Sequence, residues 1–341
     1  LAERFGRKPV LLTGLAAYAL AAGLCALAPG FETLLIARAV QGLGSAAPRV
    51  MVVALTRDCY HGRDMARVMS LTMIFFMAVP VVAPSVGQAI LLVAPWRAIF
   101  AVLGVHALVV LWIAAARLPE TLHPARRRAL RPGVLAQGAA MVLGSRQTVG
   151  YTLASGAFLG ALFGFISSAQ QILGELYGLG PLFPLVFAGI AVAIGVSAFV
   201  NARLVGRLGM RRLSHGAVMA FTVIAGALAA VAWVQPPPLP LFVGMLAAAM
   251  LLVGMVFSNF NALAMEPQAA AAGLASSMIG GFTTLFGAGV GFGIGQAYDG
   301  TVLPLTLGYA LPSPSAGGCS GARGPASAGG SSPRPASQAR G

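Results

Sequence analysis

Long apolar segments recur along the whole chain, with short polar gaps between them. The pattern predicts nine membrane-spanning helices, at residues 10–28, 33–55, 69–93, 97–116, 149–172, 181–202, 214–233, 240–264 and 272–297, and an incomplete tenth from Thr301 to Pro312. Each holds about the 20 apolar residues that a helix needs to cross a hydrocarbon core of about 30 Å. The strands of a membrane barrel would alternate over about ten residues, so we predict an all-α polytopic membrane helix bundle.

The charged residues follow the same alternation. Only 9% of the 341 residues are charged, against about 25% in a soluble domain, yet the formal net charge is +14. Every second gap, the first included, is basic, and the intervening gaps contain a single basic residue, Arg97. This positive-inside pattern places the basic gaps in the cytoplasm. A groove for nucleic acid would cluster its charge on one polar face, so we expect no nucleic-acid partner. We also expect that the chain acts as a monomer.

The residues that carry metal, cofactor and enzyme chemistry are scattered. The three cysteines and four histidines have no metal-ligand or pairing spacing. The stretch GVGFGIG at 289–295 lies inside an apolar run with no strand before it, so it fails the context test for a dinucleotide loop. Gly287, Gly291 and Gly295 instead have the four-residue spacing of close helix packing in membranes. We expect no enzyme activity, no metal and no cofactor.

An internal repeat divides the chain. LAERFGRKPV at 1–10 matches LVGRLGMRRL at 204–213, and GQA occurs at 87–89 and again at 295–297. We interpret the repeat as two half-bundles, at 1–116 and 149–311, joined by a cytoplasmic central loop at 117–148 and followed by a disordered low-complexity tail at 312–341. The second half has two helices before its basic motif. The first half is therefore expected to lack two helices, so that the chain is truncated at both ends.

Several motifs resemble those of a transporter family. LAERFGRKP resembles the loop between helices 2 and 3 of the major facilitator superfamily, and RAVQGLGSAA at 38–47 resembles its helix-4 motif. TRDCYHGRDMARVMS, PVVAPSVGQAI and SNFNALAMEP resemble the bicyclomycin/chloramphenicol-resistance branch of its drug:proton antiporters. The resemblance implies two pseudo-symmetric six-helix halves, with helices 1, 2 and most of 12 missing here. It also implies multidrug efflux by proton antiport with alternating access, in a bacterial inner membrane.

The resemblance assigns roles to three groups of residues. Proton coupling falls to Arg38, Gln41 and Arg49 of helix 4, because a cation at membrane depth is costly and usually functional. A gating motif comprises Glu3, Arg4, Gly6, Arg7 and Lys8, expected to contact helix 11 near Gly273 and Ser276, or else to hold loop charges in water. An antiporter-like motif in helix 5 comprises Pro80, Pro84 and Gly87, where the prolines bend the helix and the glycine admits a close neighbour.

The family's cavity-lining helices 7 and 10 supply the expected substrate site. We assign it to Tyr151, Phe158, Gln170, Phe257 and Asn259. Aromatic rings with a few amides suit amphipathic drugs better than sugars, which need many hydrogen-bonding groups. Asn201 and Asn261 lie near helix ends, where bonding between helices is expected instead.

All eight acidic residues lie in or beside gaps, and none lies deep in a predicted span. A proton-coupled carrier usually needs a carboxylate at membrane depth. We therefore expect that this chain alone does not carry out efflux driven by a pH gradient. Two alternatives stay open: a facilitator of metabolites or sugars without proton coupling, and a membrane fragment that does not transport.

Overall fold

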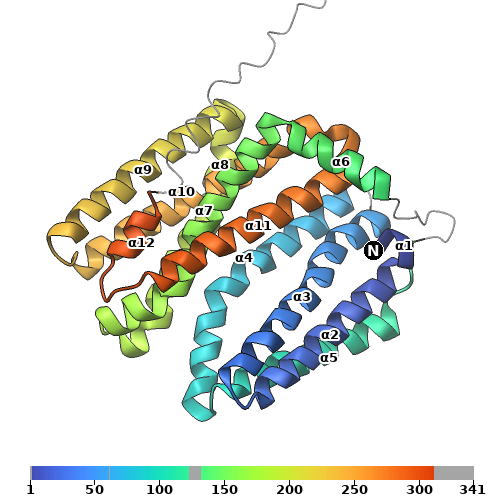
Figure 1. The fold of residues 1–341 in the computed structure, drawn as a ribbon, viewed down its shortest axis with the longest axis horizontal. Helices are drawn as coiled ribbons and strands as arrows, with labels where there is room; N and C mark the ends of the chain where they lie inside the picture. The colour runs from blue at the N-terminus through green and yellow to red at the C-terminus, as the bar shows by residue number, and fades with distance from the viewer. Residues whose placement is uncertain (1, 61, 123–131, 311–341) are drawn as a thin grey trace, which may run out of the picture.

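The computed structural model describes residues 2–60, 62–122 and 132–310, and every regular element in these ranges is helical. A short helix α1 (Ala2–Phe5) precedes four long ones and a linker helix (Figure 1). These are α2 (Arg7–Leu27), α3 (Phe31–Cys59), α4 (Gly62–Val93), α5 (Arg97–Arg117) and α6 (Pro132–Gly144). The second half has α7 (Arg146–Ala169), α8 (Phe183–Leu208), α9 (Met210–Val234), α10 (Leu239–Met265), α11 (Ala272–Gln296) and the short α12 (Leu303–Gly308).

Each of the nine predicted spans coincides with one of the long helices. Among the described residues, eight helices are long and apolar enough to cross a membrane, one fewer than predicted. In the ninth, α4, the described residues contribute only the shorter apolar segment Val82–Val93. The polypeptide is therefore a multi-pass membrane protein built from helices.

Two corresponding turns join helices at the repeated motif. Gly6 precedes α2 with φ 103°, and Gly209 precedes α9 with φ 75°. Both values lie where glycine is favoured, because a Cβ would meet the backbone. The two residues match in the sequence repeat, so the repeat extends to backbone conformation.

The helices form two groups by their contacts. In the first, α2 packs between α3 and α5; in the second, α10 packs against α7, α8 and α9, while α7 packs against α11 and α12. The principal contact between the groups joins α4 to α8. Figure 1 shows the first group in blue and cyan at one end of the molecule and the second in green to red at the other.

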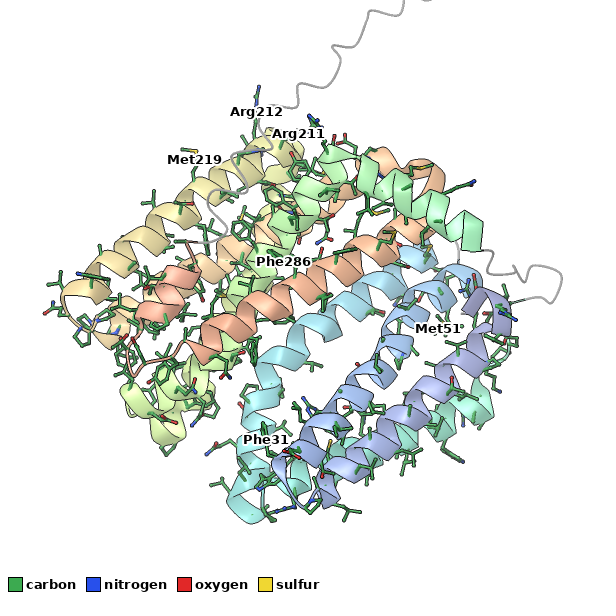
Figure 2. All side chains as sticks on the ribbon, viewed as in Figure 1. Phe31, Met51, Arg211, Arg212, Met219 and Phe286 are labelled. Atoms are coloured by element: carbon green, nitrogen blue, oxygen red, sulfur yellow. The ribbon has the colours of Figure 1, made fainter. Side chains whose placement is uncertain are left out.

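The second group has the deeper core. Helix α7 lies at its centre: 61% of the residues in its most apolar stretch are buried, against 11% in the corresponding stretch of α5. Phe158, Phe165, Phe221, Phe242 and Phe260 are all buried there. Apolar side chains such as Met219 project outward instead (Figure 2), and the exposed fractions of Phe31, Met219 and Phe286 are 75%, 71% and 42%. An outer surface of this kind suits lipid rather than water.

The interface between α7 and α11 is built from interleaved glycines. An added Cβ would fall within about 3 Å of the opposite helix at Gly156, Gly160 and Gly164 of α7 and at Gly287, Gly291 and Gly295 of α11. At Gly291 it would overlap Cβ of Phe163, and at Gly160 it would lie 2.6 Å from Cβ of Val290. The packing role predicted for the glycines of α11 is confirmed, because each accommodates a side chain of α7.

Two sequence expectations about the fold differ from the structure, and two others are not tested by it. The segment 117–148 contains helix α6, so it is not a loop throughout. Helix α4 is continuous and changes direction along its length (Figure 1), but an added Cβ at Gly87 would meet no atom within 4 Å. The expected close neighbour of Gly87 is therefore absent from the described residues. The predicted tail at 312–341 lies outside them, and the half-bundle boundaries stay predictions.

Candidate functional site

The predicted coupling residues Arg38 and Gln41 form a pair on α3. Nη1 of Arg38 donates a hydrogen bond of 2.7 Å to Oε1 of Gln41, one helical turn away. The guanidinium also lies 5.6 Å from the ring centroid of Phe100 in α5, within the range of a cation–π contact. Gln41 is only 1% exposed, and its Nε2 has no partner among the described residues. The pair thus presents a cation and an unsatisfied buried amide donor inside a span.

Arg49 belongs to the same helix α3, but its side chain lies outside the described part of the structure. Its predicted role in coupling therefore stays a prediction.

The gating motif contacts the ends of α3 and α5. Nε of Arg7 lies 3.2 Å from Oδ2 of Asp58, and the two side chains are 9% and 23% exposed. The backbone N–H groups of Arg7 and Lys8 donate to the Glu120 carboxylate at 2.9 and 3.3 Å, so this carboxylate caps the N-terminus of α2. Nζ of Lys8 donates to the carbonyl of Ala115 at 2.8 Å. Three helix ends are therefore tied together by charge.

This network gives the described partners of the motif, whereas the expected contact of Glu3 with α11 stays a prediction. The described contacts of Arg7 and Lys8 go to α3 and α5, not to α11 near Gly273 and Ser276. Arg4 is exposed, and its guanidinium lies over the ring of Phe5. The side chain of Glu3 lies outside the described residues. Sequence reasoning missed Asp58 and Glu120, although carboxylates at the ends of spans next to basic gaps were an available signal.

A second ion pair occupies the corresponding place in the second half. Nη2 of Arg211, in the first turn of α9, lies 3.1 Å from Oε2 of Glu266 after α10. The same carboxylate oxygen accepts a 2.9 Å hydrogen bond from Gln147 of α7. Glu266 follows Asp58 by 208 positions, the offset of the two GQA triplets. This second pair is about half exposed, at 47% and 53%, whereas the first is largely enclosed.

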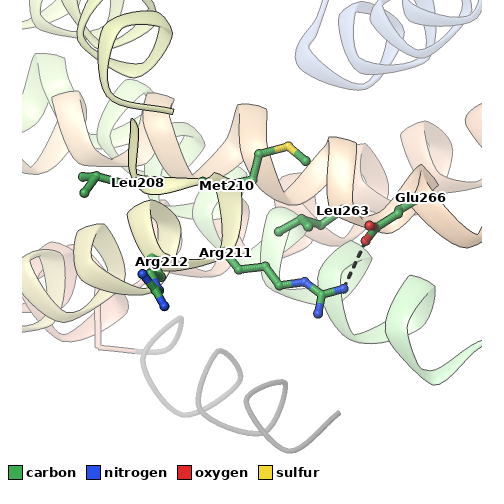
Figure 3. A pocket seen from close by; sticks show the side chains of 7 residues that line it. Leu208, Met210, Arg211, Arg212, Leu263 and Glu266 are labelled. Atoms are coloured by element: carbon green, nitrogen blue, oxygen red, sulfur yellow. Dashed lines mark hydrogen bonds and ion pairs between the residues drawn. The ribbon is translucent and has the colours of Figure 1, made fainter. Parts of the chain in front are cut away.

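A shallow cavity of about 340 Å³, largely open to the surface, lies beside the second ion pair. It is lined by Leu208, Gly209, Met210, Arg211, Arg212, Leu263 and Glu266. Figure 3 shows Arg211 reaching toward Glu266, while the guanidinium of Arg212 lies apart from that pair. None of the predicted substrate residues lines this cavity.

The predicted substrate residues do not share one surface. Tyr151 and Phe158 are 4% and 0% exposed and pack against Phe260, with ring centroids 5.0 and 6.3 Å apart. Both rings belong to the buried core of the second half, and their role at a substrate cavity stays a prediction. Gln170 is exposed at the start of a π-helical segment, Gln170–Leu176, and Phe257 is half-buried on α10.

Asn259 is engaged by another helix. Its Nδ2 donates to Oδ1 of Asn201 at 2.8 Å, and Nδ2 of Asn201 donates back to its Oδ1 at 3.2 Å. One turn earlier on α8, Ser197 lies against Gly254 of α10, where an added Cβ would be in steric conflict with the Ser197 hydroxyl. In the structure Asn259 thus links α8 and α10, and its role in substrate contact stays a prediction. Interhelical bonding was expected for Asn201 but not for its partner.

The end of α7 remote from the ion pairs is held by two tyrosines. The hydroxyl of Tyr177 donates to the carbonyl of Pro237 at 2.7 Å, and burial raises the pKa of Tyr177 to about 12. The hydroxyl of Tyr298 donates to the carbonyl of Gln171 at 3.3 Å. Burial raises the pKa of Tyr298, and the charges of Glu175 and Asp299 add to that increase. A π-helical segment held in this way is a frequent mark of functional sites.

Every carboxylate lies at or near a helix end. Glu32 and Asp64 occupy first turns, Asp58 a last turn, and Glu175 the end of the π-helical segment. Glu3, Glu120, Glu266 and Asp299 lie in short elements or connections. The described histidines, cysteines and carboxylates form no group able to hold a metal ion.

The chain is similar in sequence and in fold to known membrane transporters. Residues 1–294 match the Major Facilitator Superfamily. The chain is 32% identical over 285 residues to an uncharacterized MFS-type transporter, YdgK, of Bacillus subtilis, covering 83% of this chain and 71% of the relative. It is 29% identical over 309 residues to a bicyclomycin resistance protein homolog of Haemophilus influenzae, covering 89% and 76%.

A solved structure shows the same fold. A point mutant of the nucleoside transporter NupG superimposes with a TM-score of 0.65 at 14% sequence identity, over 93% of this chain and 83% of that one. At this identity the likeness extends to the fold and not to the substrate. Because the family match covers most of its length and a relative above 30% identity is covered over two thirds, the chain belongs to the Major Facilitator Superfamily of membrane transporters.

Proposed function

We propose that the chain is a secondary active transporter of a bacterial inner membrane, which exports amphipathic drugs by proton antiport with alternating access. The relatives that carry antibiotic-resistance names support the substrate class. The observation that carries the proposal furthest is the pair of Arg38 and Gln41 on α3. A cation inside a span is expensive to keep, so its retention points to a role in transport.

The two ion pairs support the alternating-access part of the proposal. Arg7–Asp58 joins α2 to α3, and Arg211–Glu266 joins α9 to α10, at matching places in the two halves. Both pairs lie at helix ends next to the basic gaps of the sequence. Rocking of one half against the other at the contact of α4 with α8 would change the surroundings of both pairs together.

A second candidate, a facilitator without proton coupling, rests on the placement of the carboxylates. None of the eight lies in the middle of a long helix. A carrier that releases protons on alternate sides needs a titrating group with alternating access. Of the carboxylates in described contacts, Asp58 and Glu266 are already engaged by arginines.

Proteoliposomes containing residues 1–341 separate the two candidates. The lumen is made acid, and ethidium accumulation is followed by fluorescence with and without an uncoupler. Accumulation above equilibrium that the uncoupler abolishes supports antiport. Equilibration that ignores the uncoupler supports the facilitator. Ethidium uptake no faster than that of empty liposomes supports the remaining alternative, a membrane fragment that does not transport, which the lack of a carboxylate at membrane depth favours.

The role of Arg38 is tested in the same assay. Arg38→Gln is expected to lower the transport rate at least about tenfold, because a neutral amide cannot replace the guanidinium charge. Arg203→Gln is the matched control: Arg203 is also exposed, with its guanidinium 4.1 Å from the Phe199 ring, but it lies at the end of α8. Equal rates in the two variants would remove Arg38 from the mechanism.

A further inference from the structure

The cavity beside α9 combines features that the transport proposal does not use. It lies where three elements meet: the last turn of α8, the first turn of α9 and the end of α10. One part of its lining is apolar, from Leu208, Met210 and Leu263, and the other is charged. These helix ends border the hydrocarbon region, so a ligand reaching the cavity from the bilayer would meet both parts.

The charged part favours an anion. Glu266 offsets the charge of Arg211 at 3.1 Å. Arg212 is exposed and forms no ion pair with any described residue, so its positive charge is uncompensated at the cavity. Arg207, in the last turn of α8, adds to the local positive potential. A phosphate would approach the side of the cavity away from the single carboxylate.

The backbone at the cavity adds donors to these cations. The N-cap of helix α9 is Gly209, which supplies no side-chain cap, and the first bond of the helix runs from Leu213 N–H to the Gly209 carbonyl. The N–H groups of Met210, Arg211 and Arg212 therefore have no acceptor within the helix. Free N–H groups and the helix dipole both favour an anion at this position.

We propose that this cavity binds the phosphate-bearing headgroup of an anionic phospholipid. Its volume of about 340 Å³ falls at the small end of the range for small-molecule sites, which suits a headgroup and not its acyl chains. Leu208 and Met210 line the cavity and are exposed, so their apolar side chains could contact the first methylenes of the acyl chains. Basic pockets between helix ends are a recurrent form of lipid site. The inference stands independently of drug export.

Native mass spectrometry of the purified full chain in detergent tests the proposal. Phosphatidylglycerol and phosphatidylcholine are added separately, and bound lipid is counted. The wild type is expected to bind phosphatidylglycerol more tightly. Arg212→Gln is expected to weaken that binding about fivefold, the effect typical of one basic residue near an anionic lipid. Arg203→Gln should leave it unchanged, because Arg203 does not line the cavity.

Two further arms identify the source of the phosphate. Leu208→Gln should also weaken phosphatidylglycerol binding, because it removes apolar lining without changing charge. Inorganic phosphate at millimolar concentration should not displace the lipid, and displacement would show a site for free phosphate instead. Arg212→Lys keeps the positive charge, so it should retain most of the phosphatidylglycerol binding if Arg212→Gln weakens binding through loss of charge and not through a change in structure. Equal losses in Arg212→Gln and Arg203→Gln, or equal binding of the two lipids, would overturn the proposal.

Discussion

The glycine interface between α7 and α11 allows a graded test of packing. At Gly291 an alanine Cβ would overlap Cβ of Phe163 and would lie 2.9 Å from its carbonyl carbon and 3.0 Å from the backbone nitrogen of Gly164. Two of these atoms are backbone, so no side-chain rotation relieves the overlap. Restoring ordinary contact, at 3.4–4 Å, requires the helices to separate by roughly 1 Å.

The expected cost follows from what that separation removes. Overpacking of a close-packed interface costs about 1–3 kcal/mol. Between membrane helices the packing itself drives association, so few other terms compensate. Alanine recovers up to about 1 kcal/mol through its better helix propensity. We expect Gly291→Ala to destabilise the fold by about 1–2 kcal/mol and Gly287→Ala, whose nearest atoms lie at 3.0 Å, to cost less.

Gly289→Ala is the matched control on the same helix. An added Cβ there meets no atom within 4 Å, so the helix-propensity gain should make this variant as stable as the wild type or slightly more stable. Thermal unfolding in detergent, followed by size-exclusion chromatography, measures the series. The expected order of stability is Gly289→Ala, then Gly287→Ala, then Gly291→Ala. Equal stability of the first and last would refute the inferred interface.

Three further predictions concern polar contacts. Asn259→Ala should destabilise the fold by about 0.5–1.5 kcal/mol, and adding Asn201→Ala should cost little more, because both changes break one reciprocal pair; additive losses in thermal unfolding would contradict it. Arg7→Gln should cost about 1–3 kcal/mol because it leaves the largely enclosed Asp58 charge without its cation and with a hydrogen bond from Thr121, whereas Arg211→Gln should cost under about 1 kcal/mol, a loss that should vanish in high salt; the reverse order would be decisive against this reasoning. Since burial raises the pKa of Tyr177 above its value in the unfolded chain, the stabilising contribution of its neutral hydroxyl should be complete below pH 10 and disappear as the pH rises to about 12. Tyr177→Phe should abolish this loss of stability between pH 10 and about 12, as measured by alkaline unfolding of the two proteins.

The amino-acid order alone was enough to predict the helices and much of their packing chemistry. Nine predicted spans coincide with nine helices, because in lipid each backbone group must bond within its own segment and apolar length alone then defines a span. The spacing of Gly287, Gly291 and Gly295 likewise indicated a close interface, since residues four apart share one helix face. The motifs were sufficient to indicate the transporter superfamily.

Which residues meet became clear only in the folded chain. Arg7 reaches Asp58, 51 positions away, and its backbone N–H reaches Glu120, 113 positions away. Asn259 bonds to Asn201 across 58 positions and is thereby unavailable as a free amide, while Gly87 meets no close neighbour among the described residues. Such contacts depend on how each helix is rotated about its axis and shifted along it. Hydropathy leaves both quantities undetermined in a helix that is apolar on all sides.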